Sequence, residues 1–244
     1  MTDVILIHGL SGSAADMEYI ADNLSNAGYR TFSVNLPGHG TDPGDLLHIN
    51  MQNWVDAVES RINACTDRIF IIGLSMGALL ALYCTVMHQD RIKGIILLSP
   101  AIRLYGRLNR LFMSMLYIFS RFLPIPHIYY KKTKGPDIAD QLVKRDYNAY
   151  NKIPLKALIE FERLRRATIK RLGMINVPVL MIYSKHDHTI DNNAVEIIDK
   201  KISSTIKEKR MLPNSFHVIS IDVEKRIVVD NILKFQRFIE LGVK

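Results

Sequence analysis

Short apolar runs alternate with segments of helical periodicity along most of the chain. Six runs have the length and continuity that are typical of buried strands, namely residues 4–8, 30–34, 68–72, 93–98, 177–183 and 205–212. Between them, apolar residues recur at every third or fourth position, which predicts helices over about 14–27, 51–62, 76–88 and 193–201. Strands that alternate with helices form parallel sheets, so the pattern predicts one doubly wound α/β domain with a mostly parallel sheet.

The alternation is interrupted once, over residues 101–176. This segment contains Pro124, Pro126 and Pro154 among several helical patches. Ligands of open α/β sheets bind at the carboxyl ends of the strands, and an insertion of this length suits a cap over that edge. The predicted organisation is therefore a core of residues 1–100 and 177–244 with an inserted, mainly helical cap of residues 101–176.

The composition is that of a globular protein, with 48% hydrophobic and 23% charged residues, and it argues against a disordered chain. The two cysteines, Cys65 and Cys84, lie in apolar-periodic segments. Free thiols are the simplest interpretation, although a bridge between them stays open. The first residues lead directly into an apolar strand without a basic segment, so we expect a cytoplasmic protein.

The segment Gly73-Leu74-Ser75-Met76-Gly77 follows a predicted strand and opens a predicted helix. In this context a G-x-S-x-G motif forms a sharp turn that exposes the serine hydroxyl above the sheet. A serine hydroxyl is a weak nucleophile, so it needs a general base, which in turn needs an acidic residue to orient it. Asp187 and His217 each follow a later strand, and the chain order Ser75, Asp187, His217 is the one this fold requires. Asp191 is the alternative acid, but its position suits a cap of the following helix.

Chemistry at such a serine also needs two backbone N–H groups for the negative oxygen that develops on the substrate. Met76 follows the serine at a helix N-terminus, and Leu10 follows the first strand in the segment His8-Gly9-Leu10. We expect the N–H groups of Leu10 and Met76 to form this oxyanion hole.

Together these segments resemble the α/β-hydrolase family, and within it small bacterial carboxylesterases and monoacylglycerol-lipase-like enzymes. The resemblance is carried by His8-Gly9-Leu10 with Ser13, Pro37-Gly38-His39-Gly40, Asn53-Trp54, Gly73-Leu74-Ser75-Met76-Gly77, His186-Asp187, and His217-Val218-Ile219 with Asp222, Glu224 and Lys225. It implies an α/β-hydrolase fold, shortened at its N-terminal edge because the strands that usually precede the His-Gly strand are absent. It further implies a serine ester hydrolase that forms an acyl-enzyme on short- to medium-chain acyl esters, without a metal or other cofactor.

Other chemistries stay open at this point. His186, Asp187, His188 and Asp191 are spaced densely enough to ligate a divalent metal, which would favour a metal-dependent hydrolase. The same serine, histidine and aspartate would also suit a thioesterase or a hydrolase of carbon–carbon bonds.

The net charge of +8 is concentrated in one block. Residues 101–172 carry 16 Lys and Arg against 5 Asp and Glu, whereas the rest of the chain is slightly acidic. This block has no recognisable nucleic-acid-binding motif, so we expect no nucleic-acid partner. It does contain an apolar stripe at helix spacing, formed by Leu104, Leu108, Leu111, Met115 and Phe119. Either this stripe lines an acyl pocket while the neighbouring arginines face water, or it also docks on anionic membranes.

Overall fold

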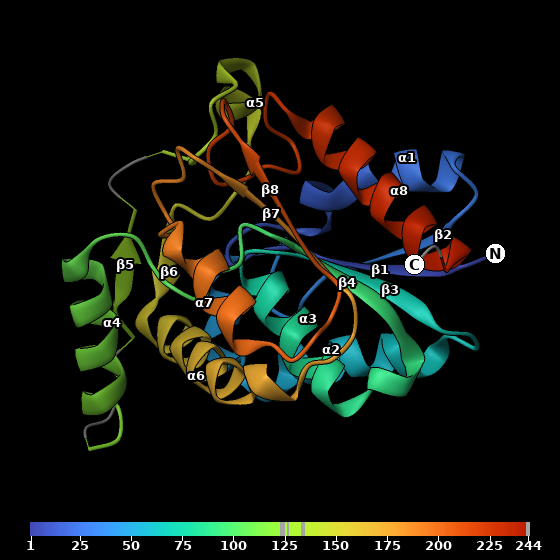
Figure 1. Ribbon diagram of the computed structural model, residues 1–244. Coiled ribbons are helices and arrows are strands. Elements are labelled where there is room, and N and C mark those ends of the chain that lie inside the picture. The colour runs from blue at the N-terminus through green and yellow to red at the C-terminus, as the bar shows by residue number, and fades with distance from the viewer. Residues whose placement is uncertain (123–124, 126, 133–134, 243–244) are drawn as a thin grey trace.

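A six-stranded parallel sheet forms the centre of the molecule (Figure 1). The computed structural model describes residues 1–122, 125, 127–132 and 135–242, so Pro124 and Pro126 of the predicted cap lie outside the described residues. The strands follow one another in the sheet in the order β2 (Arg30–Val34), β1 (Asp3–Ile7), β3 (Ile69–Leu74), β4 (Ile92–Leu98), β7 (Val179–Ser184) and β8 (Lys207–Leu212). All six strands expected from the sequence are present, and the doubly wound α/β fold is confirmed.

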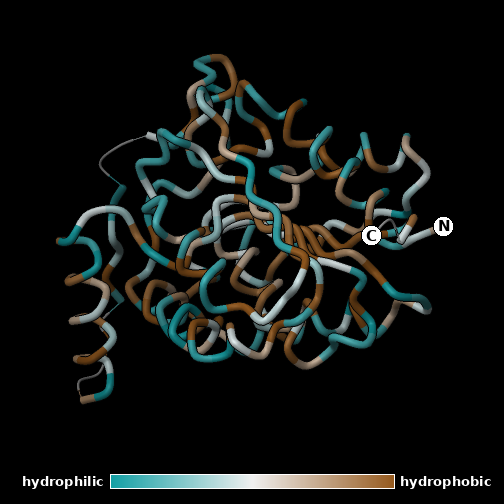
Figure 2. The backbone as a smooth tube through the Cα atoms, in the orientation of Figure 1, coloured by the Kyte–Doolittle hydropathy of each residue, from teal (hydrophilic) through white to brown (hydrophobic). Residues whose placement is uncertain are grey.

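Helices cover both faces of this sheet (Figure 1). One face carries α1 (Glu18–Asn26) and α8 (Lys225–Leu241), and the other carries α2 (Met51–Ala64), α3 (Met76–Met87), α6 (Leu155–Arg171) and α7 (Asn193–Lys201). Short 3-10 helices occur at Ala14–Met17, Pro43–His48, Gln89–Arg91 and Leu172–Met174. The central strands are apolar along their length (Figure 2) because both of their faces are covered, which explains why they form continuous apolar runs in the sequence.

Residues 101–176 connect β4 to β7 and carry α4 (Arg107–Phe119), β5 (Tyr129–Lys131), α5 (Gln141–Asp146), β6 (Lys152–Pro154) and α6. The strands β5 and β6 pair in an antiparallel manner, a feature that the sequence did not predict. Helix α6 shares the main core, because its residues Ala157, Phe161 and Leu164 are buried together with α2 and α3. The inserted segment is therefore continuous with the core on this side of the sheet.

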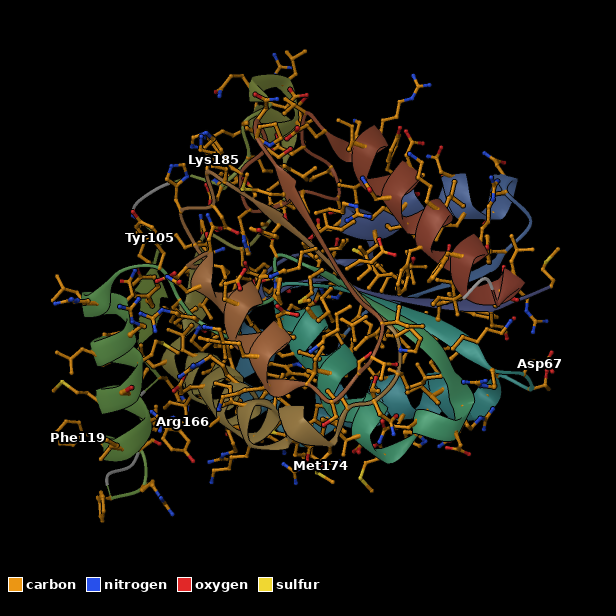
Figure 3. The ribbon with its side chains drawn as sticks, in the orientation of Figure 1. Asp67, Tyr105, Phe119, Arg166, Met174 and Lys185 are labelled. Atoms are coloured by element: carbon orange, nitrogen blue, oxygen red, sulfur yellow. The ribbon has the colours of Figure 1, made fainter. Side chains whose placement is uncertain are left out.

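Helix α4 packs against α6 on one side and faces solvent on the other (Figure 3). Met113 is 5% exposed, and Arg166 of α6 donates to the Ser114 hydroxyl at 3.1 Å while its guanidinium lies over the ring of Tyr117. Four residues of the apolar stripe, Leu108, Leu111, Met115 and Phe119, are instead 46–81% exposed, whereas the fifth, Leu104, packs against the main core. The interpretation of the stripe as the lining of an enclosed acyl pocket does not hold for these four side chains, because they face solvent.

Both cysteine thiols are buried and free: Cys65 follows α2 and Cys84 lies within α3. In the described part of the chain, none of the helices combines the length and the apolarity that crossing a bilayer requires.

Candidate active site

Ser75 occupies the turn between β3 and α3, at the carboxyl edge of the sheet. Its backbone has φ 55° and ψ −108°, a conformation that costs a residue with a side chain about 1–3 kcal/mol. Two glycines make the turn sterically feasible. A Cβ at Gly73 would collide with the carbonyl group of Gly77, and a Cβ at Gly77 would collide with the carbonyl oxygen of Ile7. The G-x-S-x-G motif thus forms the sharp strand-to-helix turn that its context predicts, with Ser75 partly exposed.

The hydroxyl of Ser75 begins a chain of hydrogen bonds through His217 to Asp187. Nε2 of His217 lies 2.9 Å from Oγ of Ser75, and Nδ1 of the same ring lies 2.8 Å from Oδ2 of Asp187. Oδ1 of Asp187 accepts the backbone N–H groups of Thr189 and Ile190 at 2.8 and 2.7 Å, which fixes the carboxylate. Because Nδ1 donates to Asp187, Nε2 is left as the acceptor for the hydroxyl proton of Ser75.

The surroundings of His217 favour its protonated form. Burial works against the imidazolium, but the charge of Asp187 and its hydrogen bond, with a smaller contribution from Asp137, raise the pKa of His217 above its ordinary value. The carbonyl oxygen of Asp137 also accepts the backbone N–H groups of His217 and Val218, at 3.0 and 3.2 Å. The inserted segment therefore contacts the histidine loop directly.

Two buried carboxylates shape the loop that carries His217. Asp222 accepts four backbone N–H groups at 2.7–3.0 Å, from Phe216, Ala139, Asp140 and Val223. Glu224 accepts the backbone N–H and the hydroxyl of Ser215, both at 2.7 Å. The sequence included Asp222 and Glu224 in the family resemblance but assigned neither of them a role. The signal that could have found them is a pair of acidic residues close behind the histidine in an otherwise apolar segment.

Asp191, the alternative acid, lies outside this chain of hydrogen bonds. Its Oδ2 accepts from Arg103 at 2.9 Å and is 3.4 Å from Nη1 of Arg110, while Oδ1 accepts the backbone N–H of Asn193 at the start of α7. Burial raises the pKa of Asp191, but the hydrogen bonds from Arg103 and Asn193 outweigh it and lower the pKa overall. Asp191 thus accepts a hydrogen bond from the first residue of α7, whose N-cap is Asn192, and links the start of this helix to Arg103, which follows β4.

The histidine and aspartate residues after β7 do not converge on a single point. Nδ1 of His188 is 2.8 Å from Oδ1 of Asp137. The carboxylate of Asp187 is instead bonded to His217, and that of Asp191 is bonded to Arg103. Among residues 1–122, 125, 127–132 and 135–242, no three His, Cys, Asp or Glu side chains are grouped so that they could hold a metal ion. The metal-dependent alternative therefore has no ligand set in this part of the chain.

The loop after β1 passes directly beside Ser75, since a Cβ on Gly9 would lie 3.3 Å from the Cβ of Ser75. Leu10 is the next residue in this loop, and Met76 begins α3 on the other side of the turn. The N–H groups of Leu10 and Met76 donate to no other backbone group in the described part of the chain. Both donors are therefore available to a bound oxygen.

His8 holds this loop in place and is neutral. Its Nε2 accepts the backbone N–H of Leu36 at 3.0 Å, and its Nδ1 is 2.8 Å from the carbonyl oxygen of Gly9. Burial, together with the charge of His39, lowers the pKa of His8 to about 3. The histidine of the His-Gly segment thus fixes the backbone and takes no part in proton transfer at neutral pH.

A pocket of about 1170 Å³ opens next to this loop, with Ser11, Asp16 and Tyr147 in its lining. Ser75 and His217 do not line it. This pocket is therefore separate from the hydrogen-bonded chain of Ser75, His217 and Asp187.

A serine at a strand-to-helix turn, with a buried imidazole and carboxylate behind it, defines a serine hydrolase with the α/β-hydrolase fold. The chain belongs to the Hydrolase_4 family: the model of that family, described as serine aminopeptidase, S33, matches residues 2–224.

Individual relatives narrow this class. The chain is 32% identical to the thermostable monoacylglycerol lipase of Bacillus sp. (strain H-257), over 95% of this chain and 89% of that protein. It is 24% identical to the carboxylesterase of Bacillus subtilis (strain 168), over 95% and 91%. A solved structure from work on the metagenome-derived lipolytic enzymes LipS and LipT superposes with a TM-score of 0.87 at 28% identity, covering 97% of this chain and 93% of that one. The protein is therefore a serine hydrolase of the lipase and carboxylesterase type.

Proposed function

We propose that the protein hydrolyses carboxylic esters of short- to medium-chain acyl groups through an acyl-enzyme on Ser75. Oγ of Ser75 attacks the acyl carbonyl carbon while Nε2 of His217 takes its proton, and Asp187 holds the imidazole in the tautomer that accepts it. The N–H groups of Leu10 and Met76 donate to the oxyanion. The alcohol leaves with the proton from His217, and a water molecule activated by the same imidazole then releases the acid.

The observation that carries this proposal is the 2.9 Å contact between the Ser75 hydroxyl and His217, whose other ring nitrogen is bonded to the buried Asp187. The names of the relatives, a monoacylglycerol lipase and a carboxylesterase, support acyl esters as the substrates. We propose that residues 101–176 act as a cap on the core of residues 1–100 and 177–244. The absence of a cofactor requirement and the cytoplasmic location stay predictions.

A panel of p-nitrophenyl esters and monoacylglycerols of graded chain length tests this function. We expect the highest kcat/KM on short- to medium-chain esters, and no hydrolysis by the Ser75→Ala variant. A thioester and a carbon–carbon substrate belong in the same panel. Cleavage of either of these in preference to all esters would overturn the proposal.

We also propose that the outward face of α4 contacts anionic lipid surfaces. This face combines exposed apolar side chains, among them Leu108, Leu111 and Phe119, with the exposed Arg107 at the start of the helix and the exposed Arg121 just after its end. Phe119 is labelled in Figure 3. Apolar burial in a lipid surface adds to an attraction of about 1 kcal/mol for each basic residue near anionic headgroups. Such contact would bring lipid-like esters near Ser75.

Co-sedimentation with vesicles tests this contact. We expect pelleting with vesicles of phosphatidylcholine mixed with phosphatidylserine, less with phosphatidylcholine alone, and a decrease at high salt. Leu111→Ser should weaken pelleting, whereas Leu142→Ser, which changes a similarly exposed leucine on α5, should not. Equal and negligible pelleting under all conditions would contradict the proposal.

A further inference from the structure

A group of polar side chains lies against the loop that carries Leu10. Ser11 follows Leu10 directly, has a positive φ of 69° and is 4% exposed. Nζ of Lys132 donates to Oγ of Ser11 at 2.5 Å, and the carbonyl oxygen of Ser11 accepts the backbone N–H of Tyr150 at 3.0 Å. Lys132 and Tyr150 both belong to the inserted segment. The insertion therefore fastens the loop at the residue next to the proposed oxyanion donor.

A second contact fastens the same loop a few residues further along the chain. The hydroxyl of Tyr147 donates to Oδ2 of Asp16 at 3.0 Å, and Asp16 is 4% exposed. A Cβ at Gly12 would collide with this carboxylate, so only glycine at this position lets Asp16 approach the loop. Burial raises the pKa of Asp16 to about 6, against the opposing effects of the Tyr147 hydrogen bond and the Lys132 charge.

Lys132 is half-buried, and its ammonium group has no carboxylate in direct contact. In the ranges that the structure describes, no Asp or Glu oxygen lies within 4.0 Å of its Nζ. Burial lowers the pKa of Lys132 to about 8, and the charge of Asp16 opposes this only in part. The Lys132 charge in turn lowers the pKa of His217, against the stronger influence of Asp187. One positive charge thus acts on both the proposed base and the oxyanion loop.

We propose that Lys132 is a positioning residue for the ester hydrolysis proposed above, on which this inference rests. Through Ser11 it holds the loop so that the Leu10 N–H faces the reacting carbonyl group. Its positive charge favours the oxyanion, and in the free enzyme it also favours the neutral form of His217, which is the form that accepts a proton. Negative charge on the carbonyl oxygen develops only as the transition state forms, so the positioning of the Leu10 N–H and the attraction of the ammonium group for the oxyanion stabilise the transition state more than the bound ester. Loss of the ammonium group therefore lowers kcat more than it raises KM.

The titration of Lys132 gives a signature that a merely structural role lacks. The groups that face it are Asp16 from the loop side, Tyr147 from the insertion and His217 across the site. As the pH rises through the Lys132 pKa of about 8, the ammonium group loses its charge and activity declines. An arginine in its place stays charged throughout this range. Activity on the alkaline side should therefore persist in Lys132→Arg.

The test measures kcat and KM for p-nitrophenyl butyrate against pH in the wild type, Lys132→Arg and Lys132→Met. Lys131→Met, at the exposed neighbouring residue, is the matched control. We expect kcat of Lys132→Met to fall about 10- to 100-fold with a much smaller change in KM. The acid limb of the pH profile of Lys132→Met should lie at higher pH than that of the wild type, because removal of a positive charge raises the His217 pKa. Lys132→Arg should retain kcat and lose the alkaline decline.

An alkaline decline near pH 8 that persists in Lys132→Arg would overturn the proposal, and this result does not depend on whether Lys132→Met folds. A pH profile of folded Lys132→Met that matches that of Lys131→Met would overturn it as well. Failure of the proposed function has a different outcome, since the wild type would then hydrolyse no ester or Ser75→Ala would retain the activity.

Discussion

Replacement of Asp222 by Asn tests how the loop that carries His217 is held. The Asp222 side chain is fully buried, and its Oδ2 accepts the Phe216 N–H at 2.7 Å while Oδ1 accepts those of Asp140 and Val223. An amide offers only one oxygen, so its NH₂ group must face an N–H donor. The amide orientation that keeps more hydrogen bonds places its oxygen at the Oδ1 position, and the Phe216 N–H then loses its acceptor. An unsatisfied buried donor costs about 1–3 kcal/mol, and loss of the charge weakens the other bonds, so we expect about 2–4 kcal/mol of destabilisation.

Urea and thermal unfolding measure this loss. For a chain of this size, about 2–4 kcal/mol lowers the Tm by roughly 4–16 °C. Since Phe216 directly precedes His217, kcat on a p-nitrophenyl ester should fall as well. Asp230→Asn, which changes an exposed carboxylate on α8, is the control and should alter the free energy of unfolding by less than about 0.5 kcal/mol. If Asp222→Asn were as stable as this control, the backbone hydrogen bonds of Asp222 would not hold the loop, and the reasoning would be refuted.

Three further experiments address the rest of the site. Gly77→Ala places a Cβ against the carbonyl oxygen of Ile7, so we expect a loss of several kcal/mol in thermal unfolding, and an unchanged Tm would contradict the steric argument. Asp187→Asn should lower kcat by about 10³- to 10⁴-fold, since it destroys the required tautomer, whereas Asp191→Asn should cost far less. The reverse order would show that Asp191 is the acid. A pH profile of kcat/KM should have its acid limb above the ordinary histidine value of 6.5, because His217 must be neutral to accept a proton and its pKa is raised. A limb well below that value would contradict the charge arrangement around the imidazole.

The strands and the hydrogen-bonded chain at the site could be predicted because each depends on a local pattern. A strand covered on both faces must be apolar throughout, so β1, β3 and β4 are legible as short continuous runs. Parallel strands bring their carboxyl ends to one edge, so residues that follow different strands, such as Ser75, Asp187 and His217, meet there.

Other features depend on contacts between distant segments and leave no periodic signal. Helical spacing shows that α4 has an apolar face, but it does not show whether protein covers that face, and most of it is exposed. Strands β5 and β6 contain three residues each, too few to form a recognisable pattern. The role of Asp222 depends on N–H groups from residues about eighty positions away, and that of Lys132 on the position of Ser11. Such groups are identified only once the chain is folded.

The most direct test of the central claim is the identification of the nucleophile by peptide mass spectrometry after treatment with a fluorophosphonate, which reacts with activated serines. We expect one phosphonyl adduct, on the peptide that contains Ser75, together with complete loss of ester hydrolysis. Ser75→Ala should melt like the wild type, take up no label and hydrolyse no ester. Labelling at another residue, or ester hydrolysis by Ser75→Ala at the rate of the wild type, would contradict the account.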